Sequence, residues 1–71
     1  MRYLVVIEQG ESSWGAHVPD LPGCVAVGES RQEVLSLIQE AVRLHIADLE
    51  ATGAAVPPAQ SDVEFVEVDA A

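Results

Sequence analysis

The pattern of apolar and polar positions predicts three short strands, one long helix and a fourth strand, in that order along the chain. Residues 2–8 are apolar on both alternating faces, which is typical of an interior strand. A polar turn follows at residues 9–13, and residues 14–18 then alternate again with their apolar side chains on one face. Two such runs joined by a short polar turn predict a β-hairpin.

Two prolines and a glycine interrupt the extended pattern directly after this hairpin. They are Pro19, Pro22 and Gly23, and together they predict a turn. The pair Pro22-Gly23 suits the centre of a type II turn, because glycine supplies the positive φ that such a turn requires. An apolar run at residues 24–27 then predicts a third strand. We therefore assign the two prolines and Gly23 a structural role.

A single amphipathic helix of about 22 residues is predicted from Arg31 to about Thr52. Ser30 is a good N-cap, and Glu33 three residues later completes an S-x-x-E capping box. Gly53 supplies the usual left-handed stop at the C-terminal end. The apolar side recurs at helical spacing and forms a wide stripe of Val34, Leu37, Ile38, Ala41, Val42, His45 and Leu49.

The last segment predicts a fourth strand at residues 62–68, after a linker rich in alanine and proline. A helix that joins two strands of one sheet makes a right-handed crossover. We therefore predict an α+β fold, β-β-β-α-β, with a four-stranded mixed sheet in the order 3-2-1-4 and one long helix on one face. The uncovered face, or the flank of the helix, is predicted to be an oligomer or partner surface. Residues 1–71 are predicted to form a single domain with a disordered tail at 69–71.

The charge balance indicates the kind of partner. Three arginines, no lysine and twelve carboxylates give a formal net charge of −9. This charge repels phosphate backbones, so we expect no direct binding of nucleic acid. It attracts a basic protein and speeds the encounter with one. The alternative is that the acidity only keeps a small protein in solution.

The small size of the chain predicts self-association. Seventy-one residues bury little more than half of their unfolded surface. The single cysteine, Cys24, excludes an internal disulfide, and no Cys/His set has zinc-site spacing. We therefore expect a homo-oligomer, a dimer or a tetramer. No stretch has the length of a signal peptide or a membrane span, which predicts a cytoplasmic location and no membrane partner.

The residues around the proline loop carry a family resemblance. Residues 18–24 read Val-Pro-Asp-Leu-Pro-Gly-Cys, residues 28–30 read Gly-Glu-Ser, and Glu40-Ala41 follows within the helix. This series resembles the N-terminal domain of HicB-family antitoxins, and the resemblance runs from Met1 to about Pro58. It implies a partial, catalytically idle ribonuclease H-like fold. It also implies a partner, a HicA-type toxin, which is a small basic ribonuclease that cuts messenger RNA.

The resemblance also implies how such a protein acts and where this chain departs from the pattern. HicB proteins of this kind cover the active region of the toxin. Typical members carry a C-terminal helix-turn-helix or ribbon-helix-helix module that binds the operator. The last segment of this chain is acidic and shows no recognition helix, so we expect no DNA-binding domain and no DNA binding.

Four residues are predicted to contact the partner: Asp20, Leu21, Glu29 and Trp14. Asp20 and Leu21 lie at the proline loop, where a turn presents side chains outward. Trp14 is the largest apolar side chain, and tryptophan is over-represented at interfaces. Glu29 belongs to the acidic positions that would meet a basic surface. The alternatives are a purely structural loop, a tryptophan that fills the sheet core, and acidic residues that form only a solvated face.

No catalytic set is visible in the sequence. Metal-dependent phosphoryl chemistry needs several carboxylates that converge on two ions. The hairpin offers only Glu8 and Glu11, and Asp20 would be the remaining ligand of such a site. We expect no metal, no cofactor and no enzymatic activity. Cys24 is flanked by apolar residues, which predicts a buried, inert thiol.

The sequence therefore favours an antitoxin that binds and occludes a HicA-type ribonuclease. The alternative is a stand-alone oligomeric binding or regulatory module of the same fold without a toxin partner. A residual nuclease activity would rest on fold analogy alone.

Overall fold

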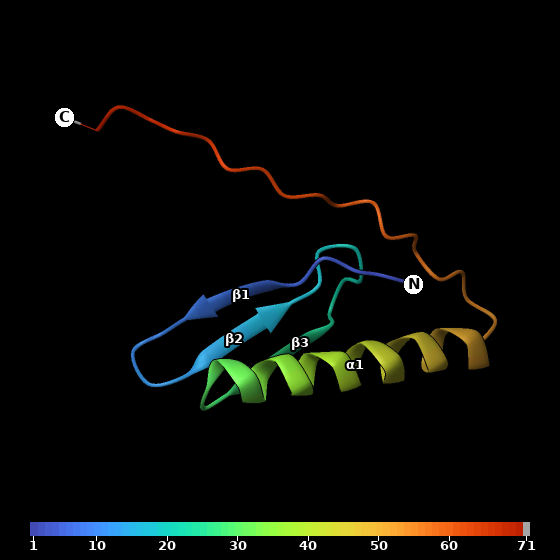
Figure 1. The fold of residues 1–71 in the computed structure, drawn as a ribbon. Coiled ribbons are helices and arrows are strands. Elements are labelled where there is room, and N and C mark those ends of the chain that lie inside the picture. Colours follow the sequence, from blue (N-terminus) through green and yellow to red (C-terminus); the bar gives the residue numbers. More distant parts are fainter. Residues whose placement is uncertain (71) are drawn as a thin grey trace.

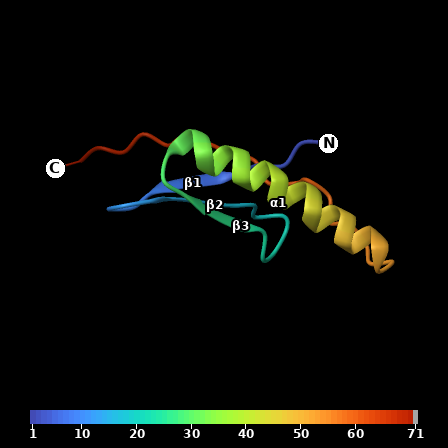
Figure 2. The ribbon, with the colours of Figure 1, turned by 90° about the horizontal axis from the view of Figure 1, so that it is seen from below.

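Three strands and one helix make up the fold in the computed structural model, which describes residues 1–70 (Figure 1). The elements are β1 (Val6–Gln9), β2 (Trp14–His17), β3 (Val25–Gly28) and α1 (Arg31–Ala51). The strands pair antiparallel in the order β1-β2-β3. Figure 2 shows α1 crossing one face of this sheet, so the molecule has two layers.

The strand register decides which side chains face the helix. Ala16 in the central strand lies opposite Ile7 of β1 and Ala26 of β3, so these three share one face. Ala16 is buried, which identifies this face as the one that α1 covers. The opposite face carries Val25 and Val27, whose side chains are 63% and 68% exposed. One face of the sheet is therefore packed and the other is open.

The core between sheet and helix is small. Among the described residues, six hydrophobic ones are buried: Ala16, Val18, Leu21, Cys24, Val34 and Ile38. The helix contributes two of them, Val34 and Ile38, which are one turn apart on the same side. Tyr3 and Trp14 are only partly buried and pack against the edge of this cluster. The burial of Cys24 confirms the prediction of an apolar environment for its thiol.

Side chains fix the start of the helix. The Ser30 hydroxyl accepts a hydrogen bond from the backbone N–H of Glu33 at 3.0 Å. The Glu33 carboxylate in turn accepts one from the backbone N–H of Glu29 at 2.8 Å. The first bond satisfies a donor that the first turn leaves open, and the second ties the Glu33 side chain back to the residue before the N-cap, in a variant of the capping box. The helix therefore begins at a point that its own sequence specifies.

Glycine fixes the end of the helix. Gly53 has φ of +76°, and its N–H bonds to the carbonyl of Glu50. The N–H of Ala54 bonds to the carbonyl of Leu49 at 2.9 Å. This pair of bonds is the Schellman arrangement, which needs a left-handed residue at this position.

The prediction of a fourth strand is wrong. Residues 62–68 are extended but pair with no strand, so the sheet is antiparallel and three-stranded rather than mixed in the order 3-2-1-4. The chain after α1 is held beside the sheet at residues 57–61 and then leaves it (Figure 1). Alternation indicates that a segment can form a strand, but a strand also needs a free partner edge.

The predicted disordered tail at 69–71 lies partly outside the description. Residues 69 and 70 are exposed and have no secondary structure, whereas residue 71 lies outside the described residues.

Gly28 lets the end of β3 approach the start of α1 closely. A Cβ at this position would lie 3.0 Å from the backbone nitrogen of Val34 and 3.2 Å from its Cα. Real Cβ atoms avoid such distances to backbone, which cannot move without shifting the helix.

We therefore expect Gly28→Ala to destabilise the fold by about 1–3 kcal/mol, as overpacking does. Gly15→Ala is the matched control, because a Cβ on that β2 glycine meets nothing within 4 Å. It should change the free energy of unfolding by no more than about 0.5 kcal/mol. Urea denaturation of the two variants measures both values, and equal effects would contradict the close approach.

Candidate partner-binding surface

The loop from β2 to β3 is built from two consecutive turns. The N–H of Leu21 bonds to the carbonyl of Val18 at 3.1 Å, and the N–H of Cys24 bonds to the carbonyl of Leu21 at 3.0 Å. The N–H of Val18 also bonds to the carbonyl of Cys24 at 3.1 Å, which closes the base of the loop. Gly23 has φ of +84°, the left-handed value that the second turn requires. The loop is therefore a fixed structure.

The apolar side chains of this loop point inward. Leu21 is 0% exposed and lies in the core with Val18 and Cys24. The side chain of Leu21, a predicted contact residue, is therefore not available to a partner. Burial also raises the pKa of the Cys24 thiol, so the neutral form is favoured. The loop thus completes the core from one end of the sheet.

Asp20 binds the chain that follows the helix. Its Oδ2 accepts hydrogen bonds from the backbone N–H groups of Ser61 at 2.8 Å and Gln60 at 2.9 Å. Its Oδ1 accepts one from the Ser61 hydroxyl at 2.7 Å. The backbone bond from Ser61 lowers the pKa of the Asp20 carboxyl most, and the Ser61 hydroxyl and the Gln60 N–H lower it further. This carboxylate is therefore occupied within its own chain.

Tyr3 provides a second tie to the same segment. Its hydroxyl donates a hydrogen bond to the carbonyl of Pro57 at 2.6 Å. Together with the bonds of Asp20, it holds residues 57–61 beside the proline loop. Sequence reasoning missed this clamp, because its partners are 40 to 54 positions apart and no local pattern links them.

The structure divides the four predicted contact residues between two ends of the sheet. Trp14 lies opposite Gly28, the residue before Glu29, so Trp14 and Glu29 lie at the same end. Asp20 and Leu21 lie in the loop at the other end. Trp14 is half-buried against the core, and Glu29 is exposed. Only the Trp14 end therefore offers a predicted contact pair that is open to solvent.

Two further carboxylates lie at the Trp14 end of the sheet. Glu11 lies in the turn that leads into β2, and Glu33 lies in the first turn of α1, which follows β3 directly. Both residues are exposed. We call Glu11, Trp14, Glu29 and Glu33 the acidic end of the sheet.

The acidic charge is almost uncompensated over the described surface. Every carboxylate side chain except the half-buried Asp20 is exposed. Within residues 1–70, the ion pair between Glu40 and Arg43 is the one that forms. An acidic surface with so few ion pairs of its own attracts an approaching positively charged molecule.

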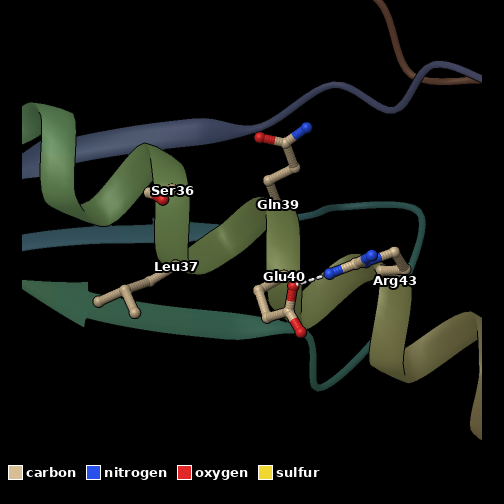
Figure 3. Close-up of a pocket in the computed structure, with 5 residues that line it drawn as sticks. All are labelled: Ser36, Leu37, Gln39, Glu40 and Arg43. Atoms are coloured by element: carbon tan, nitrogen blue, oxygen red, sulfur yellow. Dashed lines mark hydrogen bonds and ion pairs between the residues drawn. The ribbon is translucent and has the colours of Figure 1, made fainter.

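The outer side of α1 carries a shallow depression, shown in Figure 3. Its lining residues are Ser36, Leu37, Gln39, Glu40 and Arg43, all on one helix and all exposed. Figure 3 shows the Glu40–Arg43 pair spanning one side of it. The depression lies between solvent-exposed side chains, so it is not a site that encloses a ligand.

In the part of the chain that the structure describes, no three His, Cys, Asp or Glu side chains are grouped so that they could hold a metal ion. No helix within residues 1–70 has the length and apolar character needed to cross a bilayer.

Comparison with known proteins identifies the family. The family described as HicB-like antitoxin of bacterial toxin-antitoxin system matches residues 3–70. The chain belongs to the HicB-like antitoxin family. This confirms the resemblance that the loop and the helix entry indicated.

Three curated relatives agree with this assignment. A UPF0150 protein of Helicobacter pylori is 50% identical over 46 residues, which cover 65% of this chain and 64% of the relative. A UPF0150 protein of Thermoplasma acidophilum is 36% identical over 58 residues, with 80% and 84% covered. Antitoxin HicB 2 of Photorhabdus laumondii is 38% identical over 42 residues, with 59% and 30% covered. No solved structure matches.

The match thus spans less than two thirds of the Helicobacter pylori relative and less than a third of Antitoxin HicB 2.

The clamp at Asp20 gives this HicB-like domain a pH dependence with a definite sign. The pKa of Asp20 is lowered from 3.8 in the folded chain, so its bonds add stability above that value. The contribution is lost as pH falls through the lower, folded-state pKa.

We expect Asp20→Asn to be less stable than the natural chain at neutral pH, with the difference shrinking below pH 3.8. Amide exchange at Gln60 and Ser61 should become several-fold faster in this variant. Asp69→Asn, at an exposed position, is the control. A difference between Asp20→Asn and the natural chain that stays constant from pH 7 to pH 2 would contradict the clamp.

Proposed function

We propose that this HicB-like chain is an antitoxin that binds a basic HicA-type ribonuclease and occludes its active region. Family membership supports the antitoxin role. The acidic surface supports a basic partner, because opposite charges at an interface speed association and favour the correct encounter. The mechanism is steric and electrostatic coverage, without a covalent step.

The acidic end of the sheet is the proposed contact surface. Trp14 supplies an apolar side chain that is only half-buried, and Glu11 and Glu29 flank it as exposed charges. An aromatic anchor with charges at its rim is the usual composition of an interface centre. The loop end is a weaker candidate, because Leu21 is buried and Asp20 is occupied by Gln60 and Ser61.

The observation that carries this proposal is the pairing of a HicB-like fold with an acidic surface that forms one ion pair within the described residues. The test is co-expression with a basic HicA-type toxin from the same source. The toxin alone should arrest growth, and the chain should relieve the arrest. If the chain does not bind the toxin or relieve the arrest, the stand-alone binding module becomes the better explanation.

Charge reversal at the acidic end tests the contact surface itself. The double variant Glu11→Lys with Glu29→Lys should slow association with the toxin by about ten-fold or more and weaken its salt dependence. The control is Asp48→Lys with Glu50→Lys, which changes the net charge equally near the far end of α1. Stopped-flow association at several salt concentrations measures both. Equal slowing by the two double variants would contradict a contact at the acidic end.

A further inference from the structure

The last segment of the chain carries apolar side chains that its own domain does not cover. We call residues 62–70 the C-terminal arm. Every arm residue is exposed. The apolar ones are Val63 at 57%, Phe65 at 91%, Val66 at 78% and Val68 at 80% exposed. Four exposed large apolar side chains in seven residues are unusual for a monomeric surface.

The root of the arm fixes its direction. Residues 57–61 are tied to Tyr3 and Asp20, and beyond them the arm leaves the body of the domain. Figure 1 shows it running on the β1 side of the sheet, away from α1. The hydrogen bond that the arm itself makes joins the N–H of Val63 to the neighbouring Asp62 carboxylate. The arm is therefore extended outward from a fixed base.

A second apolar surface lies open elsewhere on the chain. It is the face of the sheet opposite α1, where Val25 and Val27 are 63% and 68% exposed. His17 lies between Val25 and Val6 on this face, according to the register. We call this surface the open sheet face. Of the nine large apolar residues that are exposed within residues 1–70, the arm and the open sheet face together hold six.

The overall dimensions show how much surface is left uncovered. The chain exposes 5644 Å², whereas a compact monomer of 7.5 kDa exposes about 4,200 Å². The radius of gyration is 14.4 Å, against about 11 Å for a compact domain of this length. The excess of about 1,400 Å² is larger than the roughly 800 Å² that each partner buries in a standard interface.

We propose that the C-terminal arm of one copy packs on the open sheet face of a second copy, and that the second copy returns the same contact. Val63 and Phe65 share one side of the extended arm and would face Val25 and Val27 of the other copy. Glu64, Val66 and Val68 lie on the opposite side of the arm and stay in water, and Glu67 follows Val63 and Phe65 on the contact side. The contact is isologous and closes as a dimer.

A second copy fits these observations better than a basic partner does. Both uncovered surfaces belong to the same chain, so a two-fold pair covers the open sheet face and the Val63–Phe65 side of the arm in each copy at once. Within residues 1–70 the domain buries six hydrophobic side chains, none of them aromatic, which is a small core for a chain of 71 residues. Repulsion between two acidic chains is screened beyond about 8 Å at physiological salt, whereas apolar contact acts at close range.

Sedimentation velocity on the full chain provides the first test. The natural chain should sediment as a dimer, and Phe65→Asp should raise the dissociation constant at least ten-fold. Phe65 is 91% exposed, so this change removes no contact within one copy, and circular dichroism verifies the fold. Leu44→Asp is the control, because Leu44 is 62% exposed on α1, outside both surfaces. A monomeric natural chain, or a dimer that Phe65→Asp does not weaken, would overturn the proposal.

Cross-linking provides the second test and locates the contact. A photoreactive benzophenone amino acid in place of Phe65, in a mixture of ¹⁵N-labelled and unlabelled chains, should join the arm of one copy to the segment at 25–28 of the other. Cross-links confined to a single copy would overturn the proposal. Cross-links that form only with an added basic toxin would do so as well, and would assign the arm to that partner.

Discussion

The fold depends on the packing of one side of α1 against two strands, β2 and β3, and against the proline loop. Val34 and Ile38 from the helix share the core with Ala16 of β2 and with Val18, Leu21 and Cys24 of the loop, and few other side chains are excluded from water. Burial of apolar surface is the main favourable contribution to folding. Because the core is small, the stability of the fold depends strongly on where the helix and the loop begin and end. Each of these limits positions a large share of the buried residues.

The proline loop connects this core to the rest of the chain. Its inner side chain, Leu21, completes the core, and its outer side chain, Asp20, holds the segment after the helix through Ser61. The two functions come from adjacent residues that point in opposite directions from one turn. The loop that carries the family resemblance therefore acts first as a structural junction in this chain, and the predicted contact residues that are open to solvent, Trp14 and Glu29, lie at the other end of the sheet.

The local features could be predicted from the sequence, and the long-range ones could not. The limits of α1 are encoded locally: Ser30 and Glu33 cap its start, and Gly53 follows its end. A helix between these signals could therefore be predicted from the sequence. The prediction of a fourth strand is wrong because the alternation at residues 62–68 shows only that the segment can be extended. It does not show that a strand edge is available to pair with it. The sequence predicts Asp20 as a partner contact in a turn, whereas its hydrogen-bond donors in the chain, Gln60 and Ser61, are 40 and 41 positions away, a separation that no local sequence pattern spans.

The hydrogen bonds of Tyr3 and Asp20 to residues 57–61 also explain why the apolar, strand-like segment after them leaves the sheet. Residues 57–61 are clamped at the loop end, so the chain beyond them starts from the β1 side of the sheet and not over the open sheet face. These hydrogen bonds therefore keep the C-terminal arm away from the open sheet face of the same chain. A small domain that holds its uncovered surfaces apart in this way gains little from folding back, and association with another molecule is then the direct way for it to bury them.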